Sequence, residues 1–247
     1  MCNTEVMTTL KDIKTIMDRW APPETAESWD SVGIQLGDPQ QKLSEIVVSL
    51  EVDEVVLAYL EKTKNCAVIT HHPLFFKPLK SVRYDTDMGL ILARFIKGNH
   101  HLFSAHTNLD AARDGVNDCL IEQFGLKPKQ GQPLLDGFGA FFDRPKYSYE
   151  TLCSVMPCEK RGAIYEDTIS RLAFCAGSGH GFIKRIIDLN VDTFITGEIT
   201  YHDHVTCRMN GIRVLVLGHK ESENFICQKI ADVLKAKGIE LPITVLV

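Results

Sequence analysis

The chain contains 247 residues, and its 27 lysines and arginines against 32 aspartates and glutamates give a formal net charge of −5. This balance argues against a protein whose main role is to wrap nucleic acid, although it is compatible with a local basic patch. Hydrophobic residues make up 45% of the chain and charged residues 24%. These fractions are typical of a folded globular protein and exclude long disordered stretches.

Neither a membrane span nor a secretory signal is expected. Apolar runs such as 46–48 and 214–217 have the length of strands, and no apolar run approaches the roughly 18–20 residues that a membrane helix needs. Residues 1–10 lack the basic and apolar regions of a signal peptide. The eight cysteines are scattered without a C-x-x-C pair, which favours reduced thiols in a core. We therefore expect a cytoplasmic protein without a membrane partner.

Helices and strands are expected to alternate from the first residues. A helix over 8–20 is followed by prolines and by a glycine-containing loop over 29–38. Further along, the pattern predicts strands over 45–50, 67–70 and 101–105, and helices over 53–64, 87–97 and 115–124. Such alternation is typical of an α/β fold with a largely parallel sheet.

A domain boundary is expected near residues 125–133, where Gly, Pro, Lys and Gln cluster. The sequence beyond it predicts strands over 137–142, 171–176, 193–196, 212–217 and 243–247, and helices over 148–156, 182–189 and 223–235. We expect a metal-binding domain made of residues 1–125 and 215–247. A second α/β domain over 126–214 would be inserted between its halves.

Two adjacent histidines follow the strand expected over 67–70. His71 and His72 would lie at the carboxyl end of that strand, where sites in open α/β sheets usually form. At a turn, the two imidazoles can reach two metal ions. A solvated turn with one capping histidine explains the pair equally well.

Two other strand ends carry residues of the same chemistry. Asp110 follows the strand over 101–105, where it could equally cap a helix. His219 and Glu223 follow the strand over 212–217 and would share one face of a helix at the spacing i, i+4. Together these strand ends supply imidazole nitrogens and carboxylate oxygens that two divalent ions could share. This donor set, without thiolate, favours Zn, Mn, Fe, Co or Ni.

A glycine-rich segment over 175–181, CAGSGHG, lies between an expected strand and a helix. Backbone N–H groups of Gly177–Gly181 could approach an anion there. Glu198 lies 21 residues beyond Gly177, close to the spacing of a dinucleotide fingerprint, but the third glycine comes one residue early. A tight turn or a phosphate-facing loop therefore explains the segment better than a dinucleotide site.

Six motifs in this order resemble the Nif-three-like family, whose members are often called GTP cyclohydrolase 1 type 2 homologues. They are SWDSVGIQ at 28–35, THHP at 70–73, SAHTNLD at 104–110, CAGSG at 175–179, ITGE at 195–198 and GHxxxE at 218–223. The resemblance extends from about residue 12 to residue 247. It implies a two-domain Nif-three-like α/β fold, with mixed, largely parallel sheets flanked by helices.

The resemblance also implies a dinuclear metal centre in a ring-shaped homohexamer. The family's ligand pattern falls on His71, His72, Asp110, His219 and Glu223, with Glu223 able to bridge the ions. His106 holds a family position beside the metals, where it would orient a ligand or move protons. The chain is too short for the domain that larger members insert between the halves.

The leading hypothesis is a metal-dependent hydrolase that acts on a nucleotide-like or phosphorylated small molecule, with His106 or Glu198 moving protons. The Gly177–Gly181 backbone would seat an anionic group of this substrate. A non-catalytic metal-binding assembly protein, a regulatory protein or a metal chaperone would use the same ligands. A dinucleotide-binding module is the weakest alternative, because the glycine spacing fits its fingerprint poorly. Fold and metal ligands do not by themselves specify a substrate.

Overall fold

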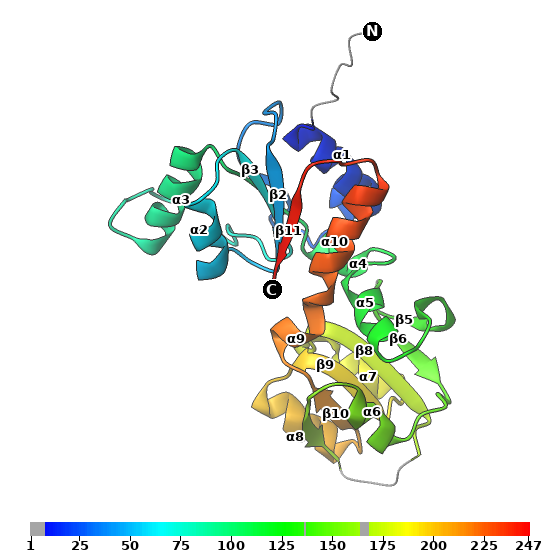
Figure 1. The fold of residues 1–247 in the computed structure, drawn as a ribbon. Helices are drawn as coiled ribbons and strands as arrows, with labels where there is room; N and C mark the ends of the chain where they lie inside the picture. The colour runs from blue at the N-terminus through cyan, green and yellow to red at the C-terminus, as the bar shows by residue number, and fades with distance from the viewer. Residues whose placement is uncertain (1–7, 136, 164–167) are drawn as a thin grey trace. The chain divides into compact units, whose positions relative to one another are not determined.

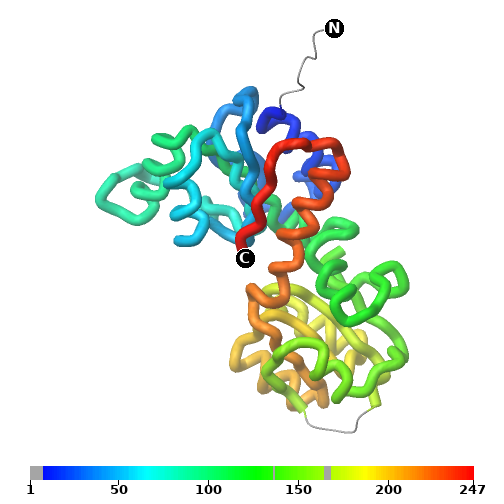
Figure 2. The backbone as a smooth tube through the Cα atoms, in the orientation of Figure 1, coloured from blue at the N-terminus to red at the C-terminus, as the bar shows by residue number. Residues whose placement is uncertain are grey.

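The structure is a computed structural model that describes residues 8–135, 137–163 and 168–247. The chain divides into two compact units, unit 1 with residues 1–109 and 226–247 and unit 2 with residues 110–225. The chain leaves unit 1 after Leu109 and returns to it after Phe225. Figure 2 follows the backbone from the N-terminus to the C-terminus as one tube coloured by residue number. No described helix is long and apolar enough to cross a membrane.

Unit 1 is built on a five-stranded sheet in the order β1-β4-β3-β2-β11. Strands β2, β3, β4 and β11 run parallel, and β1 is the antiparallel edge. In the chain these strands are β1 (Gly33–Leu36), β2 (Glu45–Ser49), β3 (Cys66–Thr70), β4 (His101–Ser104) and β11 (Ile243–Leu246). The last strand of the chain thus pairs with β2, almost 200 residues away in sequence.

Helices cover both faces of this sheet. Figure 1 shows α2 and α3 on one side, and α1 with α10 on the other. The helices are α1 (Leu10–Trp20), α2 (Glu54–Leu60), α3 (Asp87–Gly98), the short α4 (Thr107–Ala111), which crosses into unit 2, and α10 (Phe225–Ala236). Alternate strand residues face opposite helices, so Val47, Val68 and Leu102 join Phe95 of α3 in one buried cluster.

Unit 2 contains a six-stranded mixed sheet in the order β5-β6-β8-β9-β10-β7. Its centre, β8, β9 and β10, is parallel, and the outer pairs are antiparallel. The strands are β5 (Gln132–Leu135), β6 (Phe138–Asp143), β7 (Glu159–Gly162), β8 (Arg171–Ser178), β9 (Thr193–Glu198) and β10 (Arg213–Val216). The helices are α5 (Val116–Gln123), α6 (Tyr149–Val155), α7 (Ile183–Asp188), α8 (Tyr201–Met209) and α9 (His219–Glu223).

The predicted α/β class with mixed, largely parallel sheets is confirmed. Within the described residues, the predictions missed β1, β5, β7, α8 and the short α4. Strand β1 lies inside the segment 29–38 that was predicted to be a loop. Edge strands such as β5 and β7 are short and largely exposed, so their sequences lack the continuous apolar run that identified the central strands.

The boundaries between the two units differ from the expected domain limits at residues 125 and 215. Residues 110–125 and 215–225 belong to unit 2 in the structure. The reason is packing, because α5 contacts β8 and β6, and α9 contacts β8 and β9. Asp110, His219 and Glu223 were expected in the same domain as His71 and His72, and they lie in the other unit.

Candidate metal centre

In unit 1, three imidazoles gather at the carboxyl ends of two neighbouring strands. His71 and His72 follow β3, and His106 follows β4, whose Ser104 is in register with Thr70. One ring nitrogen from each of the three histidines lies within 4.8 Å of the others. We call these residues the histidine group. The sequence predicted His71 and His72 at this strand end, and the structure brings them together with His106, which the family resemblance implied beside the metals.

The hydrogen bonds of His71 determine which nitrogen can face a cation. Its side chain is completely buried, and Nδ1 lies 2.9 Å from the carbonyl oxygen of Ala105. A carbonyl only accepts, so Nδ1 carries the proton and Nε2 keeps its lone pair. Histidines that bind metals are commonly fixed in this way by a backbone carbonyl or a carboxylate.

His106 is held by the carboxylate of Asp30, which belongs to the motif at 28–35 but was not predicted to act at the site. Its Nδ1 lies 3.0 and 3.1 Å from the two carboxylate oxygens of Asp30. The backbone N–H and the hydroxyl of Thr107 also donate to this carboxylate. Burial by itself raises the pKa of Asp30, but the hydrogen bonds from His106 and Thr107 outweigh burial and lower the pKa to about 2. Asp30 is therefore a fixed negative charge behind the imidazole.

His72 has a looser partner. Its Nδ1 lies 3.5 Å from a carboxylate oxygen of Glu51. The backbone is fixed more firmly, because the N–H of His72 donates to the carbonyl of Leu50 and its carbonyl accepts from the hydroxyl of Thr70. Glu51 was not predicted to act at the site. Its position directly after the strand expected over 45–50 is the sequence feature that could have indicated it.

In unit 2, Asp110, His219 and Glu223 form a second set, which we call the carboxylate group. His219 and Glu223 lie one turn apart on α9, with Nε2 of the histidine 3.2 Å from Oε2 of the glutamate. Carboxylate oxygens of Asp110 and Glu223 lie within 4.8 Å of each other. Glu223 is almost fully buried, which is costly for a carboxylate unless cations or donors face it.

Glu198 orients His219 from the other side. Its Oε1 lies 3.1 Å from Nδ1 of His219. The hydrogen bond with Glu223, opposed by burial and helped by the charges of Glu223 and Glu198, raises the pKa of His219 to about 9. In this form a proton occupies the place between Nε2 and Glu223 that a cation would take, since metal binding requires the neutral imidazole.

The glycine-rich segment supports the carboxylate group instead of forming an open anion cradle. The N–H of Gly177 donates to the hydroxyl of Ser222, and the N–H of Gly179 donates to the carbonyl of Glu198. Gly177 has a φ of +61°, and a Cβ on it would lie 2.1 Å from Oε1 of Glu223. The glycine lets β8 pass close to the buried glutamate. The N–H groups of Gly177 and Gly179 are used within the protein and are not available to a phosphate.

One buried amide ties the rest of unit 2 to this site. Nδ2 of Asn117 donates to the carbonyl of Asp110, and Oδ1 accepts from the N–H of Ala176. Nearby, burial and the charges of Asp110 and Glu223 raise the pKa of the Cys175 thiol well above its usual value. Cys175 therefore stays a neutral thiol and the donors remain nitrogen and oxygen.

The donor chemistry fits divalent ions. His71, His106 and His219 each use Nδ1 for an oxygen acceptor and keep Nε2 for another partner. Neutral imidazoles together with carboxylates suit Zn, Mn, Fe, Co or Ni. The described residues thus contain histidines and carboxylates that could hold a metal ion.

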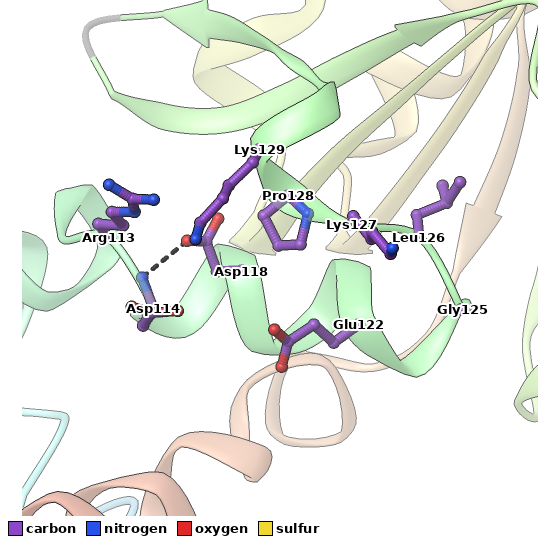
Figure 3. Close-up of a pocket in the computed structure, with 9 residues that line it drawn as sticks. All are labelled: Arg113, Asp114, Asp118, Glu122, Gly125, Leu126, Lys127, Pro128 and Lys129. Carbon is purple, nitrogen blue, oxygen red and sulfur yellow. Dashed lines mark hydrogen bonds between the residues drawn. The ribbon is translucent and has the colours of Figure 1, made fainter.

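A separate pocket in unit 2 has a volume of about 430 Å³. It lies between α5 and the segment that follows it, as Figure 3 shows. Basic Arg113, Lys127 and Lys129 line it together with acidic Asp114, Asp118 and Glu122. None of the predicted metal-ligating residues lines this pocket. Its mixed charges favour neither an anionic nor a cationic molecule.

Comparison with known proteins assigns the family. The family model described as Duf34/NIF3 (NGG1p interacting factor 3) matches residues 8–247. The chain belongs to this family. A protein named GTP cyclohydrolase 1 type 2 homolog, from Campylobacter jejuni subsp. jejuni serotype O:2, is 32% identical over 96% of both chains. A protein from Helicobacter pylori, named GTP cyclohydrolase 1 type 2, is 31% identical over 92% of both chains.

Solved structures of family members share the fold. Reduced HcgD from Methanocaldococcus jannaschii matches 98% of both chains with a TM-score of 0.85 and 26% identity. A Bacillus cereus protein related to NIF3 matches 97% of both chains with a TM-score of 0.83, at 18% identity. The expected Nif-three-like fold is therefore confirmed.

Proposed function

We propose that this Duf34/NIF3 family member binds two divalent metal ions and hydrolyses a nucleotide-like or phosphorylated small molecule. His71, His72, Asp110, His219 and Glu223 are the proposed ligands. The observation that carries the proposal is the common orientation of the histidines, whose Nδ1 atoms face oxygen acceptors in His71 and His219. The names of the Campylobacter and Helicobacter relatives support a nucleotide as the substrate.

Bound divalent ions would supply an acidified water and polarise the electrophile. The residues of the chain have separate tasks around this chemistry. Glu223, buried and close to both Asp110 and His219, is the carboxylate best placed to be shared between ions. His106 would take a proton at Nε2, because Asp30 faces Nδ1 and fixes the orientation of the ring.

Glu198 was expected among the proton-moving residues. Its contact with Nδ1 of His219 supports a positioning role, in which it fixes the ring and raises the basicity of the ligand. We propose that His106 is the catalytic residue and that Glu198 acts through His219. For the assembly, we propose the homohexamer that the family resemblance implies, which light scattering on the purified protein tests directly.

Elemental analysis of the purified, untagged protein tests the metal centre. We expect about two divalent ions per chain, with a loss of metal in His71→Ala and in Glu223→Ala. His202→Ala and Glu221→Ala, which change exposed residues outside the ligand set, serve as controls and retain the metal. A ligand variant that folds and keeps both ions contradicts the assignment.

Turnover is tested separately on the metal-loaded protein. A panel that includes GTP is incubated with wild type and with His106→Gln, and products are separated by chromatography. We expect His106→Gln to keep its metal and to lose about 100-fold or more of the rate. Bound metal with no product from any member of the panel supports the non-catalytic metal-binding alternative.

A further inference from the structure

Two large aromatic side chains next to the histidine group are exposed although their positions are fixed. Trp29 is 58% exposed and Phe76 is 52% exposed. The ring centroid of Trp29 lies 6.0 Å from that of His106, and the centroid of Phe76 lies 5.5 Å from it. Both rings stand steeply to the imidazole, at 71° and 79°. We call Trp29, Phe76 and His106 the aromatic site.

The aromatic site is held together by one amide side chain. Nε2 of Gln35 donates to the carbonyl of Ser31, two residues beyond Trp29. Oε1 of Gln35 accepts from the N–H groups of Leu74 and Phe75, immediately before Phe76. Gln35 therefore links the two segments that carry the aromatic rings.

The backbone beside Trp29 is fixed from its other side. Asp30 accepts from His106 and Thr107, and its own N–H donates to the carbonyl of Glu27 in a turn. Exposure of a tryptophan and a phenylalanine around one imidazole is unfavourable in water, since each ring could bury a large apolar area. Hydrogen bonds that hold such rings open in one arrangement are typical of a preorganised binding site.

We propose that Trp29 and Phe76 bind the planar heterocyclic ring of a nucleotide-sized small molecule beside the imidazole of His106. Flat rings gain stacking and edge-to-face contacts with exposed aromatic side chains, independently of the identity of the base. The ring nitrogen of His106 that does not face Asp30 is available to a polar edge of such a molecule. The assignment deepens the proposed function by naming residues for the ring, and it rests on that function for the chemistry next to the ring.

The intrinsic fluorescence of Trp29 gives a direct test. The chain contains two tryptophans, so Trp20→Phe leaves Trp29 as the sole reporter. Guanosine 5′-monophosphate is titrated into this variant, with ribose 5-phosphate as the ligand that lacks the ring. We expect saturable quenching by the nucleotide and none by the sugar phosphate, after correction for absorbance with N-acetyltryptophanamide.

Second variants in the same background identify the residues. Phe76→Leu removes the ring but keeps an apolar side chain, and we expect about tenfold weaker nucleotide binding. Tyr84→Leu is the matched control, because Tyr84 is an exposed aromatic residue of the same unit. We expect this variant to bind the nucleotide with unchanged affinity. Equal effects of the two variants, equal quenching by ribose 5-phosphate, or no quenching overturns the proposal.

The test separates this proposal from the metal proposal and from self-association. The titration is made with chelator-treated and with metal-loaded protein, and metal content is measured on the same samples. Retained metal without ring binding refutes the aromatic site alone, and ring binding without metal refutes the metal centre alone. Trp29 emission that shifts with protein concentration, together with a smaller assembly in Phe76→Leu, would instead assign the rings to a contact between copies and overturn the proposal.

Discussion

The Nδ1 atom of His106 lies 3.0 Å from Oδ1 of Asp30, whose side chain has no exposed surface. A buried carboxylate behind an imidazole fixes its tautomer and its orientation. The same carboxylate accepts from Thr107 at the start of α4. One aspartate thus orients the histidine and caps the helix that leads to Asp110.

Replacement of this carboxylate is expected to change the pH dependence of stability. The pKa of Asp30 falls from 3.8 to about 2 in the folded protein, so the unfolded chain binds its proton first as the pH is lowered. The stabilisation is therefore complete above about pH 5, is lost towards pH 2, and amounts to about 2 kcal/mol. Urea unfolding of wild type and Asp30→Asn checks this. A difference between the two proteins that stays constant with pH contradicts it.

Glu198 is expected to act on metal affinity through His219. Glu198→Ala removes the acceptor of Nδ1, and we expect about 10- to 100-fold weaker metal binding with little loss of stability, because the glutamate is largely exposed. Competition with a chromophoric chelator measures the affinity. Glu198→Gln keeps an oxygen acceptor and should recover part of the affinity, whereas Glu221→Ala, on helix α9 with His219, should match wild type.

The close approach of β8 to Glu223 makes Gly177 sensitive to substitution. Gly177→Ala brings a Cβ to 2.1 Å from Oε1 of Glu223 at a φ of +61°. We expect a loss of about 1–3 kcal/mol in the free energy of unfolding and a displaced glutamate with reduced metal content. Gly181→Ala meets no atom within 4 Å and serves as the control. Equal metal content in the two variants would show that the loop does not support the ligand.

Asn117 is expected to stabilise unit 2 by satisfying two backbone groups. Asn117→Ala leaves the buried N–H of Ala176 without its 2.9 Å partner and the carbonyl of Asp110 without its 3.0 Å partner. The expected cost is about 1–3 kcal/mol in chemical denaturation. Asn210→Ala, which removes an exposed hydrogen bond within its own helix, should change the stability by about 0.5 kcal/mol or less. Similar losses in both variants would contradict the role of Asn117.

The central elements of both sheets could be predicted from sequence because their patterns are local. Continuous apolar runs identified β2, β3 and β8, which are covered on both faces. Apolar residues at helical spacing identified α1, and the structure places Thr9 at its N-cap. Strand β1 escaped detection, because each of its residues is only partly buried and its pairing with β4 is formed by residues about 70 positions away.

The sequence by itself determined which donors each strand end carries, since imidazole and carboxylate chemistry belongs to the residue type. It therefore pointed to His71, His72, Asp110, His219 and Glu223, and the family assignment followed from the same motifs. Only the tertiary structure decided how these donors are oriented. Asp30 lies 76 residues from His106 in sequence, and Ala105 lies 34 residues from His71. Hydrogen bonds between residues so far apart depend on the folded structure, which no local sequence pattern encodes.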